Sequence, residues 1–92
     1  MAVSPSKQGS FLSQPATSTS SAVLFFSNGT SSTRIVMNDS AGILYVALAA
    51  TASATAFTYK LAAGTSQTIT GYGGPVSGIL DTGTGTARCT EF

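Results

Sequence analysis

The chain has 92 residues and a formal net charge of +1, and 8% of its residues are charged, against about 25% in ordinary globular domains. This length fits one domain with a single modest core, and four scattered lysines and arginines make no basic patch that would bind nucleic acid. One cysteine excludes an internal disulfide framework, and without a run of about 18 apolar residues we expect no membrane partner.

The first 20 residues differ from the rest in composition, because they hold two of the three prolines and many serines. Such a segment cannot by itself bury enough apolar surface to offset the entropy lost on ordering. Two interpretations stay open. The segment is either a frayed terminus or an extended arm that orders on a neighbouring subunit, with Phe11 and Leu12 as its anchor. We therefore divide the chain into an N-terminal arm over 1–20 and a folded domain over 21–92.

Short apolar runs separated by turn residues follow from residue 21 onward. The expected strands are 22–26, 34–38, 43–48, 56–61, 67–70, 76–81 and 86–92. Asn28-Gly29 is a strong hairpin signal and predicts that the first two strands pair. The alanine-rich stretch 47–56 contains enough serine and threonine to favour a loop over a helix. Strands at this spacing predict an all-β fold, a small antiparallel β-sandwich of about seven strands.

Three expected strands, 22–26, 34–38 and 43–48, are apolar on both faces. A sandwich covers only the inner face of each sheet, and extended apolar patches on an outer face usually mark interfaces. The low charge agrees with this, since a monomer stays soluble largely through surface charge. We therefore expect an oligomer. The partner-binding side chains expected on these faces are Val23, Phe25, Ile43 and Tyr45.

The residues needed for catalysis or metal binding are scarce. There is no histidine, which removes the commonest general base and the commonest metal ligand. Cys89 has no histidine to activate it and is interpreted as a buried, inert thiol. Three acidic residues are too few for a catalytic carboxylate pair and its support. We predict that the protein is not an enzyme and binds no cofactor or metal.

Two kinds of segment resemble functional motifs but are predicted to be turns. The glycine-rich stretch 71–75 lacks the lysine and helix of a phosphate-binding loop, so we expect a turn with Tyr72 at its tip. Asn28 and Asn38 begin sequences that match the glycosylation sequon, and both are interpreted as turn residues.

The last 55 residues carry a set of short motifs in a recognisable order. They are Asn-Asp-Ser at 38–40, Leu-Tyr-Val at 44–46, Phe-Thr-Tyr-Lys-Leu at 57–61, Tyr-Gly-Gly at 72–74, Gly-Ile-Leu-Asp at 78–81 and Ala-Arg-Cys-Thr-Glu-Phe at 87–92. As a set, these motifs resemble small virion proteins of tailed bacteriophages, and the match covers roughly 60% of the chain.

The resemblance implies a β-sandwich that serves as a virion building block. The implied role is a capsid decoration (cement) protein, a homotrimer that binds the shell of the major capsid protein and stabilises it. Its expected location is the capsid surface of the virion, after assembly in the host cytoplasm. Two alternatives stay open. One is a neck, tail or fibre-base subunit, and the other is a receptor- or glycan-binding module that uses Tyr72 as its contact.

Overall fold

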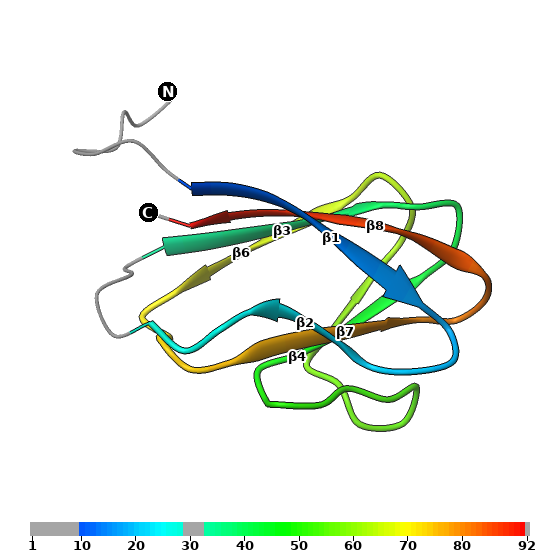
Figure 1. The fold of residues 1–92 in the computed structure, drawn as a ribbon, viewed down its shortest axis with the longest axis horizontal. Coiled ribbons are helices and arrows are strands. Elements are labelled where there is room, and N and C mark those ends of the chain that lie inside the picture. The colour runs from blue at the N-terminus through cyan, green and yellow to red at the C-terminus, as the bar shows by residue number, and fades with distance from the viewer. Residues whose placement is uncertain (1–9, 29–32, 92) are drawn as a thin grey trace.

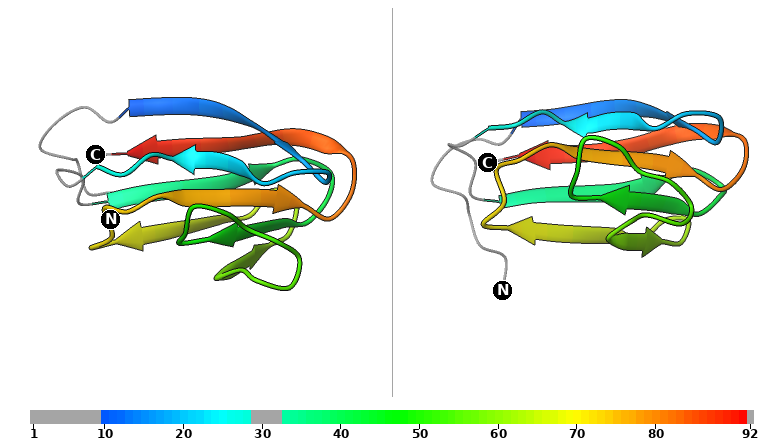
Figure 2. Two further views of the ribbon diagram at one scale, coloured as in Figure 1. Left: turned by 60° about the horizontal axis from the view of Figure 1, so that its bottom comes forward. Right: turned by 90° about the horizontal axis from the view of Figure 1, so that it is seen from below.

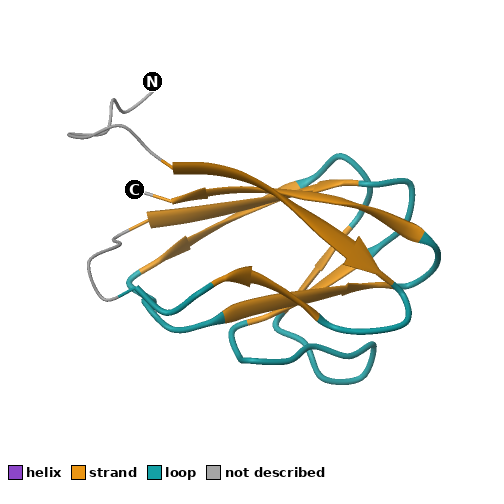
Figure 3. Ribbon diagram, viewed as in Figure 1, coloured by secondary structure: helices purple, strands orange, loops and turns teal. Residues whose placement is uncertain are grey.

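The computed structural model describes residues 10–28 and 33–91, and in these ranges the chain forms eight β-strands and no helix (Figures 1 and 3). The strands make two antiparallel sheets of four, which lie face to face as a small sandwich (Figure 2). No helix that could cross a membrane is therefore found in the described ranges. The prediction of an all-β antiparallel sandwich is confirmed, with eight strands instead of about seven.

Each sheet collects strands from distant parts of the chain. Sheet A contains, in spatial order, β1 (Ser10–Thr17), β8 (Thr84–Glu91), β3 (Thr33–Asp39) and β6 (Ser66–Thr70). Sheet B contains β2 (Ala22–Phe25), β7 (Val76–Leu80), β4 (Leu44–Ala47) and β5 (Tyr59–Leu61). Only β4 and β5 are consecutive strands within one sheet, so every other connection crosses between the layers.

Strand β1 lies in the segment that the sequence assigned to an arm. It pairs with β8 along its whole length, from Ser10 opposite Glu91 to Thr17 opposite Thr84. The arm boundary at residue 20 is therefore wrong. The physical reason is that β8 supplies a complete hydrogen-bond ladder, and Ala16, which is 1% exposed, enters the core. Residues 1–9 of the predicted arm lie outside the described residues.

The hairpin predicted around Asn28-Gly29 is also wrong. Strand β2 pairs with β7 in sheet B, whereas β3 pairs with β6 and β8 in sheet A. The connection between β2 and β3 therefore crosses from one sheet to the other, and residues 29–32 lie outside the described residues. An Asn-Gly pair favours a turn, but it does not decide which strand becomes the partner.

The core fills the space between the two inner faces. Leu24, Val36, Leu44, Val46 and Val76 are all fully buried there. Gly78 lies in the middle of the inner face of sheet B. A Cβ atom at this position would lie 2.9 Å from Leu24 Cδ1 and 3.2 Å from Leu44 Cδ1. The absence of a side chain on β7 therefore lets these two leucines approach the sheet.

Candidate functional site

The outer face of sheet B carries a group of partly exposed apolar side chains, which we call the apolar patch. Its members are Val23, Ile43, Tyr45, Phe57 and Ile79. Tyr45 is directly opposite Ile79 in the pairing of β4 with β7, and its ring centroid lies 4.8 Å from that of Phe57. Val23 is 39% exposed and Phe57 is 40% exposed. These exposures are high for side chains of this size in a chain with so little charge.

Alternation along the strands places the patch on the outer face. Leu44 and Val46 on β4 are fully buried in the core, so Tyr45 between them points to the other side. Ile43 is two residues before Tyr45, so its side chain points to the same face of the sheet. Its N–H donates to Asp81 Oδ1 at 2.9 Å, and its carbonyl accepts from the Asp81 N–H at 2.9 Å. The start of β4 is thereby held against the start of the β7–β8 connection.

The chain itself covers the rest of this outer face with the loop 48–58, which lies below β4 in Figure 1. The Ser77 hydroxyl donates to the Ala49 carbonyl at 2.9 Å, and the Ala52 N–H donates to Ser21 Oγ at 2.8 Å. As a result Ser77 and Ala47 are 1% and 5% exposed although they point outward. The expectation that apolar outer faces require a partner stays a prediction, and on sheet B it now concerns only the patch beside the loop.

One cation adjoins the patch. Lys60 on β5 is exposed and lies directly opposite Tyr45 in the pairing of β4 with β5. The ion pairs among the described residues are Arg34–Glu91 and Arg88–Asp39, so Lys60 is the one described cation outside an ion pair. A partner surface that is apolar and carries a carboxylate at its rim would complement this arrangement.

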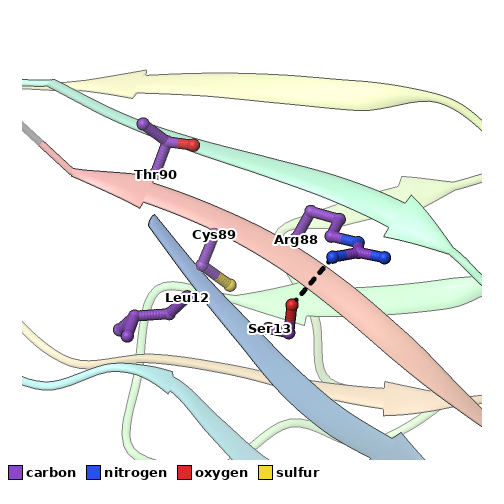
Figure 4. A pocket seen from close by; sticks show the side chains of 5 residues that line it. All are labelled: Leu12, Ser13, Arg88, Cys89 and Thr90. Atoms are coloured by element: carbon purple, nitrogen blue, oxygen red, sulfur yellow. Dashed lines mark hydrogen bonds between the residues drawn. The ribbon is translucent and has the colours of Figure 1, made fainter. Parts of the chain in front are cut away.

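The structure brings together three of the side chains predicted to bind a partner, namely Val23, Ile43 and Tyr45. Leu12 lies elsewhere, on β1 of sheet A, and is 50% exposed. It is opposite Cys89 in the β1–β8 pairing and helps to line a shallow hollow of about 160 Å³ (Figure 4). The backbone of Phe11 belongs to β1, whereas its side chain lies outside what the structure describes.

The assignment of Phe25 to a partner-binding face is wrong, because its side chain is in the core and only 3% exposed. Val23 is opposite Ser77 and Phe25 is opposite Val76, so Leu24 is an extra residue that forms a β-bulge. A bulge shifts the facing of every residue after it. Leu24 and Phe25 consequently both point inward, and a strict alternation read from the sequence could not show this.

Tyr72 is not displayed at the tip of its turn. Its side chain is half-buried and packs against the core, and its hydroxyl donates to the Pro75 carbonyl at 2.8 Å. The ring therefore folds back over its own glycine-rich turn. This arrangement removes the geometric reason for treating Tyr72 as the contact of a receptor- or glycan-binding surface.

Sequence reasoning missed a buried arginine at one end of the sandwich. Arg34 on β3 is fully buried, and its Nε donates to Glu91 Oε2 at 2.7 Å. Its Nη1 donates to the carbonyls of Tyr72 and Gly74, and its Nη2 donates to those of Phe26 and Gly73. The guanidinium also lies over the ring of Phe25, 5.1 Å from the centroid. All five N–H donors are thereby used, and both sheets and the 71–75 turn are joined.

A signal for this arrangement was present in the sequence. Arg34, Val36 and Asn38 alternate along β3, and all three are fully buried, whereas Ile35 and Met37 between them are half-buried on the outer face. An arginine within a strand of a nearly uncharged chain is a candidate for a buried pair, because burial of an arginine requires a partner for its charge. The scattered spacing of the four bases obscured that possibility.

Asn38 caps the opposite end of the core. Its Nδ2 donates to the carbonyls of Gly42 and Leu61 at 2.8 and 2.9 Å, and its Oδ1 accepts from the Ser40 hydroxyl at 2.6 Å. Both N–H bonds of the amide are used inside the protein, so this nitrogen is not accessible for a glycan. The interpretation of Asn38 as a turn residue is wrong, because Asn38 lies in β3 and only its side chain reaches the following turn, at the Gly42 carbonyl. Asn28 Nδ2 donates to Glu91 Oε1, and the other residues of that sequon lie outside the described ranges.

Cys89 is a buried free thiol, as expected from the sequence, and is 1% exposed. Removal from water raises its pKa from 9.0 to about 12.

We predict that Cys89 does not react with Ellman's reagent at pH 8 in the folded protein and reacts fully in denaturant, because the thiolate is the reactive form. The folded-state pKa is raised, so the protonated thiol's contribution to stability is complete below pH 9.0 and is lost as pH rises towards 12. Urea titrations across this pH range would measure the loss. Rapid labelling of the native protein would contradict the prediction.

In the described residues no group of three or more histidine, cysteine, aspartate or glutamate side chains is placed to hold a metal ion. No protein-family model matches the chain, and the searches of curated proteins and of solved structures found no match. The apolar patch is therefore the candidate site on which a functional proposal can be built.

Proposed function

We propose that this protein is a structural virion component, a capsid decoration (cement) protein that assembles as a homotrimer on the shell of the major capsid protein and stabilises it. The observation that carries the proposal is the apolar patch on sheet B, which stays uncovered where the loop 48–58 ends. The resemblance of the last 55 residues to virion proteins of tailed bacteriophages supplies the biological setting. In this proposal the patch closes the trimer, and other surfaces of each protomer contact the shell.

The energetics of the patch suit assembly better than capture of a free ligand. A large apolar side chain contributes roughly 1.5–3 kcal/mol when it passes from full exposure to burial. The patch residues are already partly covered by their neighbours, so each protomer gains less than this value from each of them. Association of two protomers is therefore weak by itself. Many weak contacts on one shell add through the high local concentration of binding sites.

A neck, tail or fibre-base subunit would use the same patch in the same way. The number of copies per particle separates these roles, because a cement protein occurs all over the shell and a neck or tail subunit occurs at one vertex. Quantitative gel analysis of purified particles measures this ratio. Few copies per particle would contradict the cement role and would support the neck or tail role.

Substitution Tyr45→Glu tests the patch. It places a carboxylate in the middle of an apolar contact, where the cost of removing the charge from water exceeds the gain from pairing with Lys60 opposite. We expect the trimer to dissociate to monomers in sedimentation velocity, and we expect binding to empty shells of the major capsid protein to be lost. Urea unfolding should change little, because the Tyr45 side chain lies outside the core.

Thr84→Glu provides the matched control, since Thr84 is exposed at the start of β8 on sheet A and the charge change is the same. We expect this variant to assemble as the unsubstituted protein does. If the unsubstituted protein sediments as a single monomeric species and has no affinity for shells, the proposal fails.

A further inference from the structure

The two sheets have four edge strands, namely β1 and β6 in sheet A and β2 and β5 in sheet B. An edge strand exposes a row of unpaired backbone N–H and C=O groups, to which another chain can add a strand. Folded proteins usually protect such edges with proline, a bulge, a charged side chain or a very short strand. The four edges here differ in this respect.

Three of the edges carry such protection. Strand β1 contains Pro15. The Ser18 N–H donates to the Gly83 carbonyl at 3.0 Å, and the backbone groups of alternate residues point to β8. The backbone nitrogen of residue 15 therefore points to the free edge. Its missing N–H removes a donor from the middle of that edge. Strand β2 is interrupted by the bulge at Leu24. Strand β5 has three residues, and Lys60 is the middle one.

Strand β6 carries none of these devices. Its five residues, Ser-Gln-Thr-Ile-Thr, include no proline and no charge, and its pairing with β3 runs without a register shift. The Asn38 N–H donates to the Thr65 carbonyl at 2.9 Å, so Gln67 and Ile69 make the next hydrogen-bonded pairs with β3. The peptide groups of Ser66, Thr68 and Thr70 therefore point to the free edge.

The side chains of β6 agree with an open edge. Ser66, Thr68 and Thr70 are all exposed, whereas Ile69 between them is 3% exposed and anchors the strand in the core. The Gln67 Nε2 donates to the Thr68 carbonyl at 3.1 Å, and this contact is exposed to solvent. A single side-chain contact of this kind is easily displaced by the N–H of an incoming strand.

We propose that β6 is a docking edge, and that an extended, uncharged segment of a partner polypeptide adds to it as a fifth strand of sheet A. A second copy of this chain is the less suitable occupant. Two β6 strands would pair over only five residues. The surface area buried by so short a pairing falls far short of the roughly 1,200 Å² that a stable specific interface buries. A segment tethered to a large assembly needs less area, because its local concentration is high.

The partner's identity rests on the proposed function, in which the segment belongs to the major capsid protein. The docking mode does not rest on it, since it follows from the ladder geometry of sheet A. In this arrangement the patch on sheet B joins the protomers and the edge of sheet A joins the shell. The two contacts lie in different layers of the sandwich and do not compete.

The substitution Thr68→Pro tests the edge, because it removes an N–H that points away from β3 and leaves the ladder between β6 and β3 intact. Thr68→Lys is a second variant that keeps the N–H and adds a charge to the edge. The matched control is Ser13→Pro, which removes an outward N–H from the already protected edge of β1. Circular dichroism and urea unfolding establish that each variant is folded.

Two probes are used with the full chain. The first is the end-capped peptide Thr-Val-Thr-Val-Thr at millimolar concentration, and amide exchange measured by NMR is the readout. We expect the N–H groups of Ser66, Thr68 and Thr70 to exchange more slowly with the peptide, about tenfold when about nine-tenths of the protein is bound, because they exchange only from the free protein. The second probe is empty shells of the major capsid protein. We expect Thr68→Pro and Thr68→Lys to bind them about tenfold more weakly than Ser13→Pro does.

The outcomes separate the two proposals. Slower exchange on β6 with the peptide, together with no affinity of any variant for shells, supports the docking edge and contradicts the cement role. Equal shell binding by all variants, with no effect of the peptide on exchange, overturns the docking edge and leaves the cement role standing. Protection of β6 amides that rises with protein concentration in the absence of either probe overturns the choice of occupant, because a second copy then fills the edge.

Discussion

Replacement of Arg34 by methionine is expected to lower the free energy of unfolding by about 3–5 kcal/mol, the range measured when one partner of a buried ion pair is removed. Methionine keeps much of the length of the side chain but supplies no donor. Glu91 would then keep a carboxylate whose side chain is only 19% exposed. The carbonyls of Phe26, Tyr72 and Gly74 would also lose the donors that Arg34 supplies, whereas the Gly73 carbonyl would keep the Asn28 N–H.

This loss is large in relation to the whole protein, because domains of this size are stable by about 5–15 kcal/mol. We expect cooperative urea unfolding at a clearly lower midpoint with an unchanged slope. The 71–75 turn should also become more mobile, since Arg34 contacts three of its carbonyls.

Arg88→Met is the matched control for Arg34→Met. Arg88 donates to Asp39 Oδ2 at 2.9 Å, but the two side chains are 57% and 46% exposed. Exposed pairs of this kind contribute about 0–1 kcal/mol. Equal losses from the two variants would mean that the Arg34 network does not stabilise the fold more than a surface pair does. The two substitutions remove the same charge, so a difference between them reports burial and hydrogen bonding.

Leu44→Ala is expected to cost about 2–5 kcal/mol, the usual range for a large-to-small substitution in a core. Leu44 is fully buried on β4 and stands between Leu61 and Leu80 in the pairings of that strand. Its Cδ1 atom also fills the space above Gly78. The rigid sheet around it cannot collapse into the space left, so part of the cost is an unfilled cavity.

Leu12→Ala is the control for this substitution, because it deletes the same atoms from a side chain that is 50% exposed. Because the Leu12 side chain is only half-buried, we expect the substitution to lower the free energy of unfolding by roughly 1 kcal/mol, about half of what full burial of a leucine contributes. Thermal and urea unfolding of both variants would measure the difference. A loss at Leu12 as large as that at Leu44 would place the main core elsewhere than between the two inner faces.

Several features of the fold and of the candidate site followed from local patterns. The alternation of apolar and polar residues and the glycine-rich turns were sufficient for the all-β class and for the approximate positions of seven strands. The same patterns placed Val23, Ile43 and Tyr45 on outward faces, where the structure has them. The burial of Cys89 also followed from its place in a strand.

Other features failed to follow because they depend on partners far away in the chain. The bulge at Leu24 turns Phe25 inward, and it arises from the pairing of β2 with β7 about 50 residues later. Residues 10–17 have a composition typical of a flexible arm, yet they form a strand because β8 supplies backbone hydrogen-bond partners along their whole length. Arg34 was read as one of a few scattered bases, although Glu91 directly opposite makes its burial possible.

By itself the sequence determined that the chain is a β domain with no histidine, little charge and more apolar strand surface than a sandwich interior needs. These properties depend on composition and on the period-two alternation, which are local. The tertiary structure alone decided which strands pair, which part of the outer face the loop 48–58 covers, and which edge has no strand partner among the described residues. Each of these depends on backbone hydrogen bonds between segments distant in sequence, and the sequence of one strand does not specify which strand pairs with it.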